Sequence, residues 1–79
     1  MKADELLDHI SKNRGLKFTA AWLCEGYKEK GKFVCQVELD SEGVKVLPCT
    51  ARDRAMRMTR EIFKEAYDGE WEIIDVLRG

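Results

Sequence analysis

The sequence predicts an α+β fold. We expect a single domain over residues 1–79, with the element order α-β-β-β-α-β and an antiparallel sheet that carries the second helix on one face. Apolar residues recur at helical spacing near the amino terminus and again after residue 50, whereas the segments between alternate apolar and polar residues. Isolated glycines separate these segments. A chain of 79 residues has room for one hydrophobic core only.

The first helix is expected to begin at Ala3. An apolar stripe is formed by Ala3, Leu6, Leu7 and Ile10, because these residues are spaced by three or four positions. Acidic residues occupy the first turn and basic residues the last turn, as the helix dipole favours. Gly15 follows, and glycine readily adopts the left-handed conformation that ends many helices.

The next segment changes to a period of two. From Leu16 to Cys24, apolar and polar residues alternate closely enough to predict a strand. A short helix is the alternative for residues 19–25, with Thr19 as its cap and Gly26 as its terminator. The alternation favours the strand, but the sequence leaves both structures open.

Two hairpins then follow from the alternation in residues 33–39 and 44–48. A four-residue turn at 28–31 would place Cys24 opposite Cys35 and Trp22 opposite Val37. A turn at 40–43 would place Val37 opposite Val46 and Glu38 opposite Lys45. Both registers put the large apolar residues on one side of a three-stranded antiparallel meander.

The second helix is expected from Thr50 to Asp68. Thr50 followed by Asp53 resembles a capping box, and Gly69 ends the pattern before a last strand at 70–77. On a helical wheel the apolar arc centres on Ala51, Ala55, Met58, Ile62 and Ala66, with Met56, Phe63 and Tyr67 at its sides.

The sheet face opposite this helix is more apolar than a solvated face usually is. The expected registers place Leu23, Gln36 and Leu47 in one row across this face, with Val34 and Cys49 in the next. Either the first helix or a second subunit covers this face, or it is a protein-binding patch. The sequence does not decide between these possibilities.

Composition and motifs argue against several functional classes. The net charge of −1 excludes a bulk phosphate binder. We expect no enzyme, because a lone histidine (His9) and isolated glycines form no catalytic or phosphate-binding constellation. We expect no cofactor and no metal, since Cys24, Cys35 and Cys49 lack a close ligand pair. Neither a signal peptide nor a membrane span is evident, so we expect a cytoplasmic protein that does not bind membranes.

Basic residues allow one nucleic-acid hypothesis. They are Lys28 and Lys30 in the first hairpin loop and Arg52, Arg54 and Arg57 in the second helix. Together with the α-β-β-β-α order of the first 68 residues, they resemble the double-stranded RNA-binding domain, a family in which basic residues opening the second helix contact phosphates. Here Asp53 interrupts the cluster, and acidic residues at helical spacing offer ion pairs to the arginines. Direct nucleic-acid binding is therefore the alternative rather than the favoured function.

The stretch from Gly31 through Met58 is expected to form a hairpin followed by an alanine- and methionine-rich helix. In size and in this arrangement the chain resembles the small anti-CRISPR proteins encoded by phages and other mobile elements. The resemblance implies a non-enzymatic inhibitor, acting in the host cytoplasm, that binds a subunit of an RNA-guided surveillance complex and blocks its target-DNA binding. No residue roles are transferred. Instead, we expect partner contacts from charged residues of the hairpin turns and second helix, namely Glu38, Asp40, Glu42, Arg54, Arg57 and Arg60.

Overall fold

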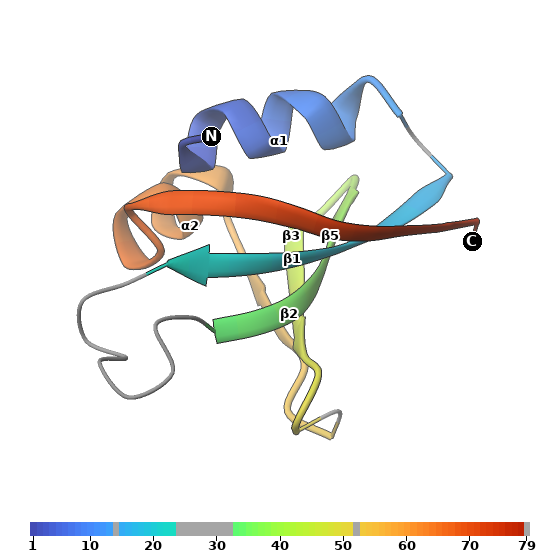
Figure 1. Cartoon of the computed structure of the whole chain (residues 1–79). Coiled ribbons are helices and arrows are strands. Elements are labelled where there is room, and N and C mark those ends of the chain that lie inside the picture. The colour runs from blue at the N-terminus through green and yellow to red at the C-terminus, as the bar shows by residue number, and fades with distance from the viewer. Residues whose placement is uncertain (14, 24–32, 52, 79) are drawn as a thin grey trace.

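The structure, a computed structural model, describes residues 1–13, 15–23, 33–51 and 53–78 (Figure 1). Its elements are α1 (Ala3–Ser11), β1 (Leu16–Leu23), β2 (Phe33–Asp40), β3 (Gly43–Pro48), β4 (Met56–Met58), α2 (Arg60–Ala66) and β5 (Glu70–Arg78). The strands form one antiparallel sheet in the order β4-β3-β2-β1-β5. The predicted α+β class and the predicted order of the main elements are confirmed, with β4 as an additional short strand.

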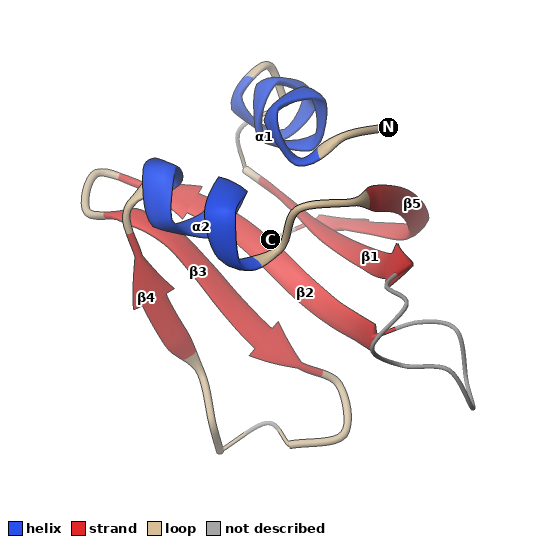
Figure 2. Cartoon of the chain, turned by 90° about the vertical axis from the view of Figure 1, so that its left-hand side faces the viewer, coloured by secondary structure: helices blue, strands red, loops and turns tan. Residues whose placement is uncertain are grey.

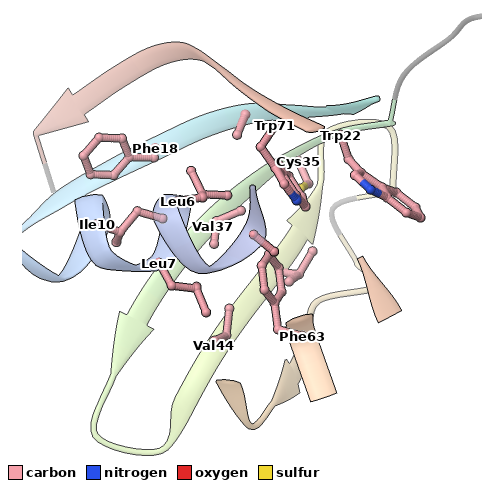
Figure 3. Packing of buried hydrophobic residues seen from close by; sticks show 13 residues of the cluster. Leu6, Leu7, Ile10, Phe18, Trp22, Cys35, Val37, Val44, Phe63 and Trp71 are labelled. Carbon is pink, nitrogen blue, oxygen red and sulfur yellow. The ribbon is translucent and has the colours of Figure 1, made fainter. Parts of the chain in front are cut away.

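Both helices lie on the same face of the sheet (Figure 2). The predicted stripe of α1 is confirmed, since Ala3, Leu6, Leu7 and Ile10 are all buried in the core. These side chains pack against the same sheet face as Phe63 of α2 (Figure 3). The first helix therefore does not cover the opposite face, and one of the possibilities left open by the sequence is excluded. We call that opposite face the open face.

The core follows directly from the alternation of the strands. Phe18, Ala20 and Trp22 of β1 point toward the helices, as do Cys35 and Val37 of β2. All of these side chains are at most 9% exposed. Each fully buried apolar side chain contributes about 1.5–3 kcal/mol relative to an exposed one, and this burial is the main force that holds α1 and α2 on the sheet.

Aromatic rings gather where α2 ends and β5 begins. They belong to Trp22, Phe33, Phe63, Tyr67 and Trp71, with ring centroids of neighbouring members 5.0–6.4 Å apart. The two indoles also donate hydrogen bonds. Trp22 Nε1 donates to the Asp68 carbonyl at 3.0 Å and Trp71 Nε1 to the Tyr67 carbonyl at 3.1 Å. Carbonyls at a helix end lack partners within the helix, so the indoles satisfy them and attach α2 to β1 and β5.

One of the two predicted hairpin registers is confirmed and the other is wrong. The β2–β3 register is confirmed, with Val37 opposite Val46 and Glu38 opposite Lys45. The predicted β1–β2 register is wrong by four residues, because Phe18 and not Trp22 lies opposite Val37. Because of the same shift, Leu23 does not lie in the predicted row with Gln36. Thr19 is the β1 residue opposite Gln36.

The error in register has a physical cause. A tight turn at 28–31 would produce the predicted register, whereas β1 ends at Leu23 and Trp22 is held by Trp71 and by the Asp68 carbonyl. A shift by an even number of residues keeps every side chain on the same face of the sheet, so the predicted core face of β1 is still correct. Residues 16–23 form a strand rather than the alternative helix, and the predictions for Cys24 and the 28–31 turn lie outside the described residues.

The predicted second helix is wrong in its first half. The helix begins at Arg60, and residues 56–58 pair with β3 as β4, with Met56 opposite Val46 and Met58 opposite Val44. The cap is therefore Thr59 rather than Thr50, and its Oγ1 accepts a hydrogen bond from the Ile62 amide at 3.2 Å. Alanine and methionine favour helices by propensity. Here, however, residues 56–58 pair with β3 and so satisfy backbone groups at its edge that would otherwise have no partner in the sheet.

Because α2 begins at Arg60, different side chains face the core, and the predicted apolar arc is wrong. Ile62, placed at its centre, is 53% exposed, and Ala55 and Ala66 are exposed as well. Phe63, placed at its side, is fully buried. None of the helices in the described part of the chain is long and apolar enough to cross a membrane.

Candidate protein-binding surface

A group of exposed charges lies where the β2–β3 turn meets β4 and the start of α2. We call Asp40, Glu42, Arg57 and Arg60 the charged corner. Asp40 ends β2, and its Oδ1 accepts a hydrogen bond from the Glu42 amide at 2.8 Å, which closes the turn through a side chain. Gly43 then begins β3 with φ +131°, in the left-handed region. A Cβ at Gly43 would overlap the Met58 carbonyl oxygen, so glycine lets the turn lie directly against β4.

Arg57 joins the turn to β4. Its guanidinium is hydrogen-bonded to the Asp40 carboxylate, and its Nη1 lies 3.2 Å from Glu42 Oε2. The Glu42 amide and the Arg57 guanidinium hold the pKa of the Asp40 carboxyl below its ordinary value. The side chains are 36% exposed for Asp40, 50% for Arg57 and 74% for Glu42. The corner therefore presents charges of both signs in a defined arrangement that solvent and partners can reach.

Arg60 adds a positive charge beside this group. It is the first residue of α2, directly after the Thr59 cap, and Gly43 lies against the backbone of Met58 and Thr59. Arg60 is exposed and has no ion-pair partner among the residues that the structure describes. The helix start thus brings a second arginine to the same end of the sheet as the β2–β3 turn.

The other two predicted contact residues lie elsewhere. Glu38 is two residues before Asp40 on the open face, and its carboxylate lies 3.8 Å from Lys17 Nζ. Arg54 precedes β4 at the opposite end of the sheet, where its amide donates to the Ala51 carbonyl at 2.9 Å. The structure thus collects four of the six predicted residues, places Glu38 next to them and separates Arg54.

The Lys17–Glu38 ion pair was not found by sequence reasoning. It depends on the β1–β2 register, which was shifted by four residues in the prediction. The strand that positions Arg57 was also missed. The alternation of Met56, Arg57 and Met58 is its only sequence signal, and three residues are too few to distinguish it from a helix.

The nucleic-acid hypothesis required a row of arginines on a helix. Instead, Arg54 lies in the segment before β4, and Arg57 lies on β4 with both Asp40 and Glu42 at its guanidinium. Lys28, Lys30 and Arg52 lie outside the described residues. An arginine already bonded to carboxylates must give up those contacts to bind phosphate, so this arrangement differs from the row of free arginines that the hypothesis required.

Two residues of nucleophilic or metal-binding type, Cys35 and His9, pack against core side chains. Burial raises the pKa of the Cys35 thiol to about 12, with a smaller contribution from Cys49. His9 packs its ring edge against Phe18, with centroids 5.4 Å apart. Within the described part of the chain, no three residues among His, Cys, Asp and Glu are grouped to hold a metal ion.

In comparisons with known proteins, no protein-family model, curated protein or solved structure matches the chain.

Proposed function

We propose that this protein is a non-enzymatic inhibitor that docks its charged corner onto a protein partner. Following the resemblance to anti-CRISPR proteins, we propose as partner a subunit of an RNA-guided surveillance complex whose target-DNA binding is blocked. The size of the chain and the β2–β3 hairpin carry this resemblance, because residues 56–58 form β4 in place of the predicted helix. The observation that carries the proposal is the arrangement of Asp40, Glu42 and Arg57, which are exposed and yet fixed by mutual contacts.

Fixed charges of both signs suit recognition of a protein. A side chain that is already held in place loses little conformational entropy when a partner binds, so more of the contact energy remains available for affinity. Opposite charges in a defined pattern also select a complementary surface and repel surfaces with the wrong pattern. Asp40 and Arg57 act as the frame, whereas Glu42 and Arg60 present the more accessible charges.

The test measures target-DNA binding by purified RNA-guided surveillance complexes, in a gel-shift assay, with and without the protein. We expect the wild-type chain to inhibit at least one complex in a representative panel. Glu42→Lys and Arg60→Glu should each weaken that inhibition about tenfold or more, because each reversal places a like charge against the partner. The melting temperature should stay within a few degrees, since exposed charge changes cost little stability.

Arg54→Glu is the matched control. It makes the same charge change as Arg60→Glu at the opposite end of the sheet, and inhibition should be unchanged. Equal effects of the two arginine variants would contradict the assignment to the charged corner. Failure of the wild-type chain to inhibit or bind any complex of the panel would contradict the proposed partner class.

The alternative function makes a different prediction. A nucleic-acid-binding module of the double-stranded RNA-binding type would bind RNA directly, with an affinity that falls steeply as salt is raised. For the proposed function, titration with double-stranded RNA alone should show no such salt-dependent binding. Tight, salt-sensitive binding that is lost in Arg54→Glu would favour the alternative.

A further inference from the structure

The open face of the sheet is covered by neither helix (Figure 2). Its centre is made of small or neutral residues, namely the half-buried Thr19, Val34, Gln36 and Leu47 and the fully buried Ala21. Two larger apolar side chains lie on the same face and are exposed, Leu23 by 42% and Leu77 by 44%. A mostly uncharged centre of this kind suits packing against a second sheet at about 10 Å.

The open face carries charged residues at its β3 margin and at its β5 margin, and some of them have no ion-pair partner among the described residues of one chain. Lys17 pairs with Glu38, and Arg57 pairs with carboxylates of the charged corner. Lys45 on β3 and Glu72 and Asp75 on β5 have no ion-pair partner among the described residues. The cross-strand pairs Ala21–Glu72 and Thr19–Asp75 place both acids on the open face, as the Glu38–Lys45 pair does for Lys45.

These opposite charges cannot neutralise one another within the chain. Two strands, β2 and β1, separate β3 from β5, so the margins lie about 14 Å apart at ordinary strand spacing. Among the described residues of the β3 margin, only Lys45 carries a positive charge without an ion-pair partner, because Arg57 opposite it on β4 is bonded to Asp40 and Glu42. The other margin is acidic. Such a face is complementary to itself after rotation about a suitable axis.

We propose that the open face binds a second copy of this chain in a two-fold symmetric dimer. A two-fold axis parallel to the strands, between β1 and β2, places β3 of each copy against β5 of the other. Lys45 then lies one row from the second copy's Asp75, within reach of its side chain, and the contact occurs twice. An axis perpendicular to the strands would instead bring β5 against β5 and oppose like charges.

The size of the face is sufficient for this contact. Four strands of about six residues give a footprint on the order of 400 Å² per copy, at ordinary strand dimensions. Because side chains project from the sheet, the accessible area exceeds this planar footprint. The two copies together would bury on the order of 1,000 Å², the lower end for specific interfaces. We therefore expect a reversible dimer rather than an obligate one.

Sedimentation equilibrium of the whole chain tests the proposal. The wild-type protein should dimerise with a dissociation constant that rises with salt. Lys45→Glu and Asp75→Lys should each weaken dimerisation about tenfold or more, because each change creates like-charge contacts at two symmetric positions. The double variant Lys45→Glu/Asp75→Lys should recover most of the lost affinity. Glu72→Lys provides a second variant of the acidic margin.

Lys64→Glu and Glu65→Lys are the matched controls, because both residues are exposed on α2, which packs on the other face. They should leave dimerisation unchanged, and far-UV circular dichroism should show that every variant is folded. A wild-type monomer at the highest soluble concentration would overturn the proposal, as would a dimer insensitive to the β3 and β5 substitutions. Failure of the double variant to recover affinity would also overturn it.

The dimer does not rest on the proposed inhibitory function. Glu42→Lys and Arg60→Glu are expected to reduce inhibition without changing the dimer dissociation constant. The two proposals can therefore fail separately.

Discussion

Gly43 is the residue on which the geometry of the charged corner depends most directly. Its φ of +131° lies in the region that side chains rarely adopt, and its α-carbon lies against the Met58 carbonyl of β4. The neighbouring hydrogen bond from the Glu42 amide to Asp40 needs this turn, and Arg57 reaches Asp40 only because β4 lies so close. A single glycine thus determines where three charged side chains meet.

Gly43→Ala should destabilise the protein by about 2–4 kcal/mol, since it adds backbone strain and an overlap with β4. Gly15→Ala is the matched control. Gly15 also has a positive φ, of +89°, but nothing lies within 4 Å of an added Cβ, so the cost should be about 1 kcal/mol. Urea unfolding of both variants measures the difference. Equal losses would contradict the close approach of Gly43 to β4.

At the scale of elements, α2 is shorter than its sequence suggests and is positioned by one large side chain. Phe63 is the buried residue of this seven-residue helix, and it packs between Tyr67 and Trp71. Short helices are not stable alone, so the packing of Phe63 and the Thr59 cap hold α2 in place. The start of α2 determines in turn where Arg60 lies.

Phe63→Ala should cost about 3–5 kcal/mol, because it removes a fully buried ring from a packed core. Ile62→Ala should change the free energy of unfolding by about 0.5 kcal/mol or less, since Ile62 is 53% exposed. Thermal or urea unfolding distinguishes the two. A large loss of stability for Ile62→Ala and a small one for Phe63→Ala would contradict the burial of Phe63. It would favour the predicted helix, in which Ile62 faces the core.

At the scale of the whole molecule, the buried residues form one continuous cluster from α1 to Trp71 of β5. Cys35 lies at its centre on β2 and is fully buried. Its thiol has a pKa raised to about 12 by burial, so very little thiolate exists in the folded state at neutral pH. A reagent that attacks thiolates therefore reaches Cys35 only when this core opens.

In a Cys24→Ser/Cys49→Ser variant, Cys35 should react with a disulfide reagent at least about 1,000-fold more slowly than an unfolded thiol. The free energy of opening obtained from this rate should equal the free energy of unfolding from urea. Cys49, half-buried and tested in a Cys24→Ser/Cys35→Ala variant, should react without global unfolding. A markedly lower opening energy for Cys35 would show that β2 opens separately from the rest of the core.

Much of the fold was predictable because it depends on local periodicity. The stripe of α1, the alternation of β1 to β3 and the β2–β3 register were all correct, since a short turn at 40–43 leaves few alternatives. The charged corner was predicted in part for the same reason, as Asp40 and Glu42 belong to that turn. Arg54 was predicted to lie on a helix that does not form there, and the structure places it before β4, at the opposite end of the sheet.

The sequence by itself determined which residues face the core along β1, β2 and β3 and that the chain folds as an α+β protein. The tertiary structure alone decided the β1–β2 register, the conversion of residues 56–58 into β4 and the side on which α1 packs. Periodicity is a property of neighbouring residues, whereas pairing partners and helix placement are chosen by backbone hydrogen bonds and burial between residues far apart in the sequence. The contact of Arg57 with Asp40 and the uncovered sheet face both follow from those long-range choices.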